Sequence, residues 1–95
     1  MSLEEIIVTG EEALKVADAL TSTSYKILQL LSREALDVTT IAERLELSEA
    51  YMSKQIRLLE GLRLVSVNYE KGKQGIRKVC RSAVRKITIV IVPEI

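Results

Sequence analysis

The amino-acid sequence predicts a mainly α fold with a small antiparallel β-sheet, with residues 1–95 as a single domain. Two changes of pattern carry this prediction. From residue 39 to residue 62, apolar residues recur three and four positions apart, as they do along one face of a helix. After Leu62 the period falls to two, which is typical of strands. The chain is 47% apolar, with four glycines and one proline, so we expect an ordered globular domain with one small core.

The N-terminal third predicts an extended segment and two helices. Residues 3–8 can form a short strand or an arm. Thr9 and Glu12 have the spacing of a capping box, so a helix is expected over residues 10–20. Its apolar stripe is wide for a helix with one neighbour, and part of it is predicted to face a second subunit. The cluster of hydroxyl residues at 21–24 ends this helix, and a central core helix is expected from Ser24 to about Arg33.

Residues 39–62 predict a helix-turn-helix. A first short helix has Thr39 as its expected N-cap. Ser48 is a suitable N-cap for a second helix, 49–62, because its hydroxyl can accept a bond from an orphaned backbone N–H. The apolar positions of the second helix share one face: Met52, Ile56, Leu59 and Leu62. Two helices joined by so short a turn form a helix-turn-helix.

The outer face of the second helix carries side chains suited to DNA. We expect Ser53, Lys54 and Gln55 to read bases, because Gln can pair with adenine and Lys can donate to guanine. Backbone contacts are expected at three further positions: Ser48, Tyr51 and Arg57. Glu49 is the weakest candidate, because its charge opposes phosphate. The alternative is an ordinary solvated helix face.

A hairpin at residues 64–82 follows as a predicted wing. Its loop and returning strand carry basic residues expected on the DNA backbone or in the minor groove: Lys71 and Lys73 in the loop and Arg77 on the strand, where Lys78 and Arg81 continue the basic surface. Residues 1–70 hold seven Lys/Arg and twelve Asp/Glu, net −5, whereas residues 71–95 hold seven Lys/Arg and one Glu, net +6. Such a basic segment is typical of phosphate-binding surfaces. The alternative is a hairpin whose lysines only keep it soluble.

Residues 84–92 predict an extra terminal strand rich in β-branched residues. A strand that is apolar on both faces invites aggregation at an open edge, so it should be paired. The partner is either the Ile6–Val8 segment of the same chain or a strand of a partner subunit.

Several classes of function lack the residues they need. The chain has one cysteine and no histidine, which argues against a disulfide framework, a Cys/His zinc site and a His-based triad. Cys80 is expected in the core, with a redox-sensing thiol as the alternative. No Gly-rich loop leads into a helix and no paired carboxylates stand out, so we expect neither an enzyme nor a cofactor. No apolar run can span a bilayer, and Glu4 and Glu5 lie where a leader would be basic. A cytoplasmic, nucleoid-associated protein is expected.

Residues 39–65 and the hairpin resemble the winged helix-turn-helix of small prokaryotic transcription regulators. The ArsR-like class, particularly its archaeal members, is most similar, with MarR-like regulators second. The resemblance covers roughly residues 12–82 and rests on the following residues: Thr40-Ile41-Ala42 with Leu45, Leu47-Ser48, Met52-Ser53, Ile56, Leu59-Glu60 and Leu64-Val65. It implies a homodimeric, sequence-specific regulator of double-stranded DNA, with helix 49–62 in the major groove and the wing on the backbone.

The sequence departs from this family in four respects. Arg63 stands where glycine is usual, and in a left-handed helix cap it would cost about 1 kcal/mol. Leu58 stands where the family is often polar, so it can extend the core or touch the tail. The clustered ligands of the family's metal sensors are missing, since Cys80 is alone, so no metal is expected. A strand replaces the dimerisation helix, so a homodimer is expected through helix one and the terminal strands.

Three other functions stay open on the sequence alone. The basic strip can bind an acidic protein in the transcription machinery. The chain can bind DNA without sequence preference, like a chromatin protein. The terminal strands can form an oligomerisation module.

Overall fold

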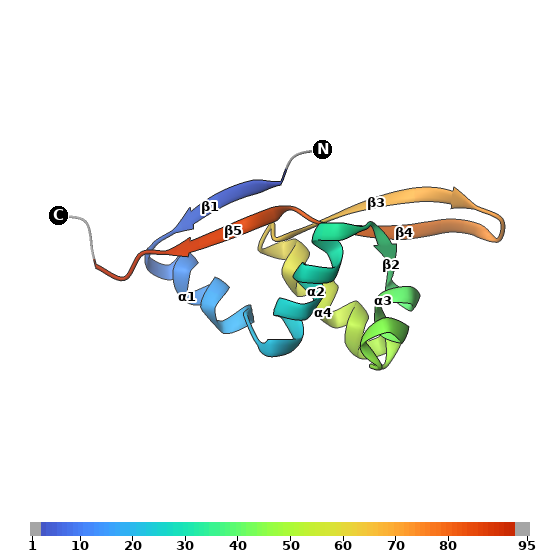
Figure 1. The fold of residues 1–95 in the computed structure, drawn as a ribbon, viewed down its shortest axis with the longest axis horizontal. Coiled ribbons are helices and arrows are strands. Elements are labelled where there is room, and N and C mark those ends of the chain that lie inside the picture. Colours follow the sequence, from blue (N-terminus) through green and yellow to red (C-terminus); the bar gives the residue numbers. More distant parts are fainter. Residues whose placement is uncertain (1–2, 93–95) are drawn as a thin grey trace.

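The computed structural model describes residues 3–92. Within them the chain forms four helices and five strands in the order β1-α1-α2-β2-α3-α4-β3-β4-β5 (Figure 1). The helices are α1 (Gly10–Ala19), α2 (Ser22–Arg33), α3 (Val38–Leu45) and α4 (Glu49–Gly61). The strands are β1 (Glu4–Val8), β2 (Leu36–Asp37), β3 (Val65–Gly72), β4 (Gly75–Ser82) and β5 (Val84–Ile89).

The strands form two sheets at opposite ends of an elongated molecule of 54 × 27 × 19 Å. One is a three-stranded antiparallel sheet, β2-β4-β3, whose β3–β4 hairpin extends beyond the helices as the wing (Figure 1). The other is a parallel pair, β1-β5. The tail strand therefore pairs within the chain, as one of the two alternatives predicted. It ends at Ile89 and not at residue 92, because β1 ends at Val8, whose carbonyl accepts the last bond from Val90.

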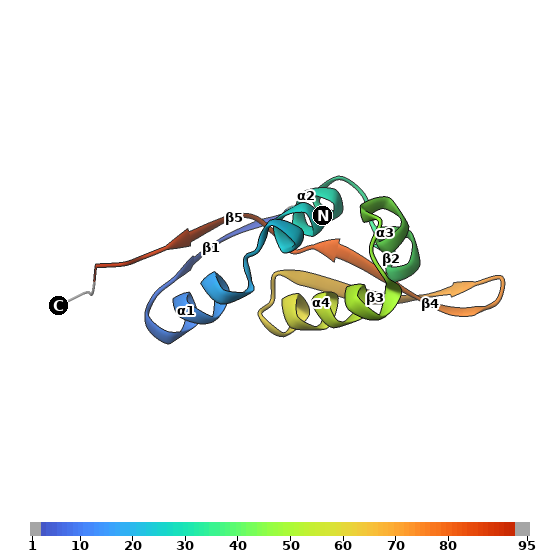
Figure 2. The same ribbon diagram turned by 90° about the horizontal axis from the view of Figure 1, so that it is seen from below.

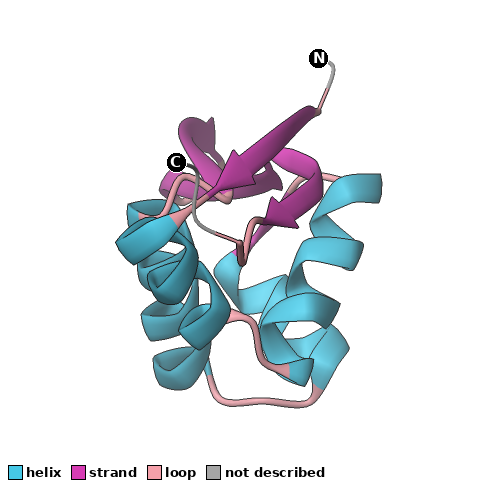
Figure 3. Ribbon diagram, turned by 90° about the vertical axis from the view of Figure 1, so that its left-hand side faces the viewer, coloured by secondary structure: helices cyan, strands magenta, loops and turns pink. Residues whose placement is uncertain are grey.

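The helices lie on one side of the strands (Figure 3), the side seen from below in Figure 2. The buried core lies between the helices and the strands. Its fully buried side chains come from all four described helices, from the residue before β3 and from β4: Val16, Ile27, Leu31, Ile41, Met52, Ile56, Leu59, Leu64 and Cys80. Leu58 is 46% exposed, so it does not extend this core.

The starts of α1 and α2 both differ from the sequence prediction. Thr9 is the N-cap of α1, but its side chain makes no capping bond, so the predicted capping box with Glu12 is wrong. The next residue, Gly10, has φ +57°, and the chain enters α1 through a left-handed step that a capping box does not use. Helix α2 begins at residue 22, two residues early, because Thr21 and Ser24 form a reciprocal capping box.

The helix-turn-helix occupies residues 38–61, shifted by one residue from the prediction of 39–62. Thr39 is not the cap of α3; the carboxylate of Asp37 takes that place and accepts the N–H of Thr40 at 2.8 Å. A carboxylate reaches the first-turn N–H groups as well as a hydroxyl does and adds favourable charge there. At the end of α4, Arg63 has φ +63°, which confirms the left-handed cap. Its N–H donates to the carbonyl of Glu60 at 2.9 Å.

Candidate nucleic-acid interface

Local bonds hold α4 in a fixed position against the core. The hydroxyl of Ser48 accepts the N–H of Tyr51 at 3.1 Å, which confirms the predicted N-cap. In the turn before it, Glu46 adopts a left-handed conformation (φ 57°), so the chain reverses between α3 and α4. The hydroxyl of Thr39 donates to the carboxylate of Glu49 and thereby ties the start of α3 to the start of α4. Glu49 is thus engaged within the protein and lies where the dipole of α4 favours a negative charge.

The three predicted base-reading residues do not share one face of α4. Lys54 is exposed and lies opposite the buried residues Met52 and Ile56. Ser53 and Gln55 are half-buried, and at about 100° per residue they lie on opposite flanks, roughly 160° apart. Lys54 is therefore central, and its two neighbours can reach only the sides of a groove that α4 enters.

Two apolar residues of the exposed face were missed by the sequence reasoning. Ala50 and Leu58 lie one helical turn before and after Lys54, and both are exposed. Small apolar side chains in a major groove contact the methyl group of thymine. Spacing of four residues on either side of Lys54 is the signal that could have identified them.

The predicted backbone residues on this helix are all accessible. Ser48 is exposed at the N-terminus of α4, where backbone N–H groups favour an anion. Tyr51 is 40% exposed and lies on the same side of the helix as Lys54. Arg57 is exposed one turn further along. A surface of this kind can contact both base edges and the flanking phosphates.

The wing presents its basic residues on both of its faces. In the register of β3 and β4, Lys71 lies opposite Ile76, and Glu70 lies opposite Arg77. Because successive residues alternate between faces, Lys71 and Arg77 point in opposite directions. Lys73 lies in the turn between the strands. A single flat contact with DNA would therefore use the turn and only one of the two faces.

Arg77 is partly neutralised by the protein itself. Its Nε is 3.9 Å from Oδ2 of Asp37, and Glu70 lies across the strand pair. The pKa of Asp37 is lowered, chiefly by its hydrogen bonds from Thr40 and to a lesser extent by Arg77, so this carboxylate stays charged. Lys71 and Lys73 are thus more available to phosphates than Arg77.

The face of the wing that continues from the core carries Lys78, which lies opposite Tyr69 on the same face as Lys71. The sequence already indicated that Lys78 continues the basic surface of the hairpin. Tyr69 is 69% exposed and was missed as a surface candidate, although strict alternation along β3 and β4 is the signal that could have identified it.

Three further observations concern the thiol of Cys80, possible metal ligands and membrane-spanning helices. Cys80 is fully buried, and burial raises the pKa of its thiol to about 11, so it is a core residue and not a reactive thiolate. Among residues 3–92 no group of three or more His, Cys, Asp or Glu could hold a metal ion. The same part of the chain contains no helix that is both long and apolar enough to cross a bilayer.

Comparison with known proteins agrees with this geometry. Residues 21–67, from the N-cap of α2 into β3, match the family of bacterial regulatory proteins of the arsR type. No curated protein sequence matches the chain significantly.

Several solved structures have a similar fold, and some of them are described as transcriptional regulators or possible regulators. One is the homodimeric winged helix-turn-helix DNA-binding domain of a possible ArsR-family regulator from Mycobacterium bovis, at 24% identity and a TM-score of 0.66. This match covers 77% of the present chain and 65% of that one. Reduced HlyU from Vibrio cholerae has 26% identity and a TM-score of 0.60, and the match covers 76% of this chain and 73% of that one. An ArsR-like regulator from Rhodococcus has 29% identity and a TM-score of 0.56, with 75% and 64% covered.

The present chain thus spans just under two thirds of the length of the Mycobacterium protein chain. The archaeal assignment and the MarR-like alternative stay predictions, since these similarities support only the ArsR-like part of the resemblance. The fold is a winged helix-turn-helix with an extra terminal strand, and the stretch that matches the arsR family, residues 21–67, includes its helix-turn-helix.

Proposed function

We propose that this protein is a sequence-specific transcription regulator that binds double-stranded DNA as a homodimer. The observation that carries the proposal is the placement of exposed Lys54 and Arg57 on α4, on the side opposite its buried residues, beside a wing with lysines at its tip. In this arrangement α4 enters the major groove and the wing lies on the flanking backbone. Such a regulator acts where the chromosome is, in the cytoplasm and associated with the nucleoid.

Each proposed contact has a distinct role. Lys54 reads base edges at the centre of α4, with Ser53 and Gln55 contributing at the two sides. Ser48, Tyr51 and Arg57 hold phosphates next to the groove. Lys71 and Lys73 anchor the wing, and Arg77 contributes less because of its carboxylate neighbours.

Dimerisation is proposed through α1 and the terminal strands. Leu14 on α1 is 68% exposed and Ile7 on β1 is 71% exposed, although both are large apolar residues. Apolar surface at this end, away from the wing, is typical of an interaction site. A two-fold dimer would read a pseudo-palindrome with half-sites about 10–10.5 base pairs apart, or a multiple of it.

The test is selection of bound fragments from sheared genomic DNA, followed by footprinting at two salt concentrations. We expect a protected pseudo-palindrome that the double variant Lys54→Ala, Gln55→Ala no longer selects. The matched control is Lys26→Ala on α2, which lies outside the proposed interface. Protection without sequence preference would instead indicate a chromatin-like binder. No retention of DNA at low salt would refute the proposal and favour a protein partner.

A further inference from the structure

One edge of β5 has backbone groups without a strand beside them. Within residues 3–92 β5 pairs with β1 alone. The N–H of Val90 donates to the carbonyl of Val8, and Val8 is aligned with Ile89. Since alternate residues of a strand bond to a given neighbour, Thr88 and Val90 direct their N–H groups toward β1, whereas Ile87 and Ile89 direct theirs to the other side. Such an edge is a template for another strand.

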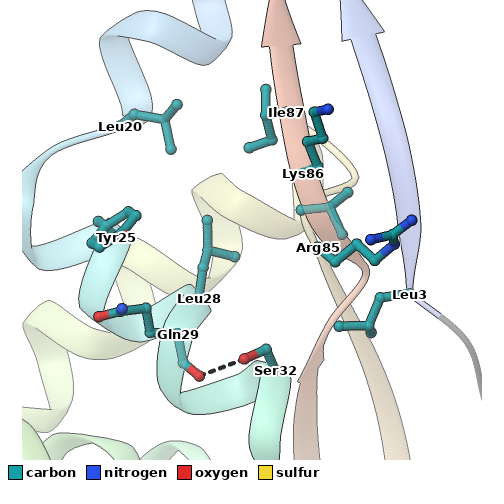
Figure 4. A pocket seen from close by; sticks show the side chains of 10 residues that line it. Leu3, Leu20, Tyr25, Leu28, Gln29, Ser32, Arg85, Lys86 and Ile87 are labelled. Carbon is teal, nitrogen blue, oxygen red and sulfur yellow. Dashed lines mark hydrogen bonds between the residues drawn. The ribbon is translucent and has the colours of Figure 1, made fainter.

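A groove runs along this edge of β5. Its volume is about 460 Å³, and α2 and the end of α1 form its far wall (Figure 4). Apolar side chains line most of it, chiefly Leu3, Leu20, Leu28 and Ile87. Tyr25 and Gln29 lie at its rim on α2. The groove therefore combines an apolar lining with a row of backbone donors and acceptors, the combination that receives an extended segment.

The residues after β5 supply a segment that fits this groove. Ile91 and Val92 are 87% and 76% exposed, and both are β-branched, so they favour an extended conformation. They follow directly on β5 and lie beyond the end of β1, so no strand within the described residues 3–92 covers them (Figure 1).

We propose that the β5 strands of two copies pair antiparallel at this edge across a two-fold axis. The result is one four-stranded sheet in the order β1-β5-β5-β1, in which residues 90–92 of each copy cover the groove of the other. This inference rests on the proposed homodimer and specifies how it is held together. The partner is a second copy because a strand satisfies the outward N–H and C=O groups, which a small apolar ligand does not.

Backbone pattern and charge both fit this pairing. About a two-fold axis near Thr88 or Ile89, the outward-directed residues of one strand meet those of the other, as an antiparallel ladder requires. Arg85 and Lys86 at the start of one strand then lie beside the apolar end of the other, so like charges stay apart. The outer edge of β1 is less suitable, because it begins with Glu4 and Glu5, and charged residues discourage edge pairing.

Amide hydrogen exchange of the full chain, measured by NMR together with sedimentation equilibrium, tests the pairing directly. The amides of Ile87 and Ile89 should be as protected as that of Thr88 in the dimer, and should lose protection on dilution to monomer. A dimer in which they exchange freely would overturn the proposal, and so would a protein that is monomeric at every concentration tested.

Two substitutions distinguish pairing through the backbone of β5 from contacts made by its side chains. Ile89→Pro removes an outward N–H without removing a bond to β1, and should raise the dimer dissociation constant about tenfold or more, since each dimer loses two bonds. Its matched control, Ile89→Ala, keeps the N–H and should weaken the dimer less. If Ile89→Pro does not fold, Ile91→Lys serves instead, because its exposed site leaves the monomer intact while it places a positive charge beside the partner's Arg85 and Lys86.

Failure of this inference is distinguishable from failure of the proposed function. A wild-type protein that selects a pseudo-palindrome but keeps its dimer in both Ile89→Pro and Ile91→Lys would refute the strand pairing alone. A dimer that both variants dissociate, in a protein that retains no DNA, would support the pairing and refute the regulatory function.

Discussion

The strongest quantitative prediction concerns how DNA affinity depends on salt. Each phosphate contact releases counterions, so the logarithm of the association constant falls with the logarithm of salt concentration, with a slope of about −0.9 per contact. Three exposed cations per protomer are proposed to hold phosphates and have no carboxylate partner within residues 3–92: Arg57, Lys71 and Lys73. A dimer therefore has about six such contacts, which predicts a slope of about −5.4.

Replacing Lys73 by glutamine removes one of these contacts from each protomer. The slope should become shallower by about 1.8, to roughly −3.6. Arg77→Gln should change the slope by less than half as much, because Asp37 lies 3.9 Å from its guanidinium and Glu70 lies across the hairpin. Lys73 lies in an exposed turn, so the fold should be unaffected.

The assay is fluorescence anisotropy of a labelled duplex, titrated between about 50 and 300 mM salt, a range over which such contacts change affinity strongly. The control is Lys26→Gln on α2, an exposed lysine outside both the wing and the proposed dimer surface of α1. An unchanged slope for Lys73→Gln would refute the placement of the wing on phosphates. An equal change for Lys26→Gln would show that only net charge matters.

Three further predictions concern stability and reactivity. Ser24→Ala should lower the free energy of unfolding by about 2 kcal/mol in urea denaturation, because its buried hydroxyl donates to the Ala19 carbonyl at 2.6 Å and takes part in the cap of α2. The control Ser22→Ala, at an exposed position of the same helical turn, should change the free energy of unfolding little. Asp37→Ala should cost about 1 kcal/mol at pH 7, and the cost should fade below about pH 4. The native pKa of Asp37 is depressed, so its stabilisation is complete above the unfolded-state pKa and is lost as pH falls through the native one. Cys80 should react with thiol reagents at pH 7.5 far more slowly in native than in urea-unfolded protein, since it is buried and its pKa is about 11.

Periodicity predicted the helix-turn-helix and the wing because burial there follows one simple rule for each element. Met52, Ile56 and Leu59 lie on one helix face, and all three are fully buried. The helix-turn-helix and the wing depend on spacing alone, which a single sequence records. The left-handed cap at Arg63 was expected only from the family resemblance, in which glycine is usual at this position.

The helix caps were harder to predict, because several residues near a helix start can serve as its cap and contacts in the folded protein decide which one does. Thr39 and Asp37 are both good N-caps by residue type, and the chain uses the carboxylate of Asp37, which lies near Arg77 in the folded protein. The choice between these caps is not recorded in the spacing of apolar residues. The grouping of Ser53 and Gln55 with Lys54 is a different kind of error, because the spacing of Met52 and Ile56 already places Ser53 and Gln55 on opposite flanks of the helix.

The shape of the molecule separates its charged and apolar surfaces along the longest axis. The wing carries exposed lysines at one end, while exposed Ile7, Leu14 and Ile91 belong to the β1–α1–β5 end (Figure 1). If DNA contacts one end and a second copy contacts the other, changes at one surface leave the other intact. The two events are nevertheless linked, because a dimer engages two half-sites at once and gains from the high effective concentration of the second. Weakening the β5 pairing should therefore lower affinity for a full pseudo-palindrome while leaving affinity for an isolated half-site unchanged.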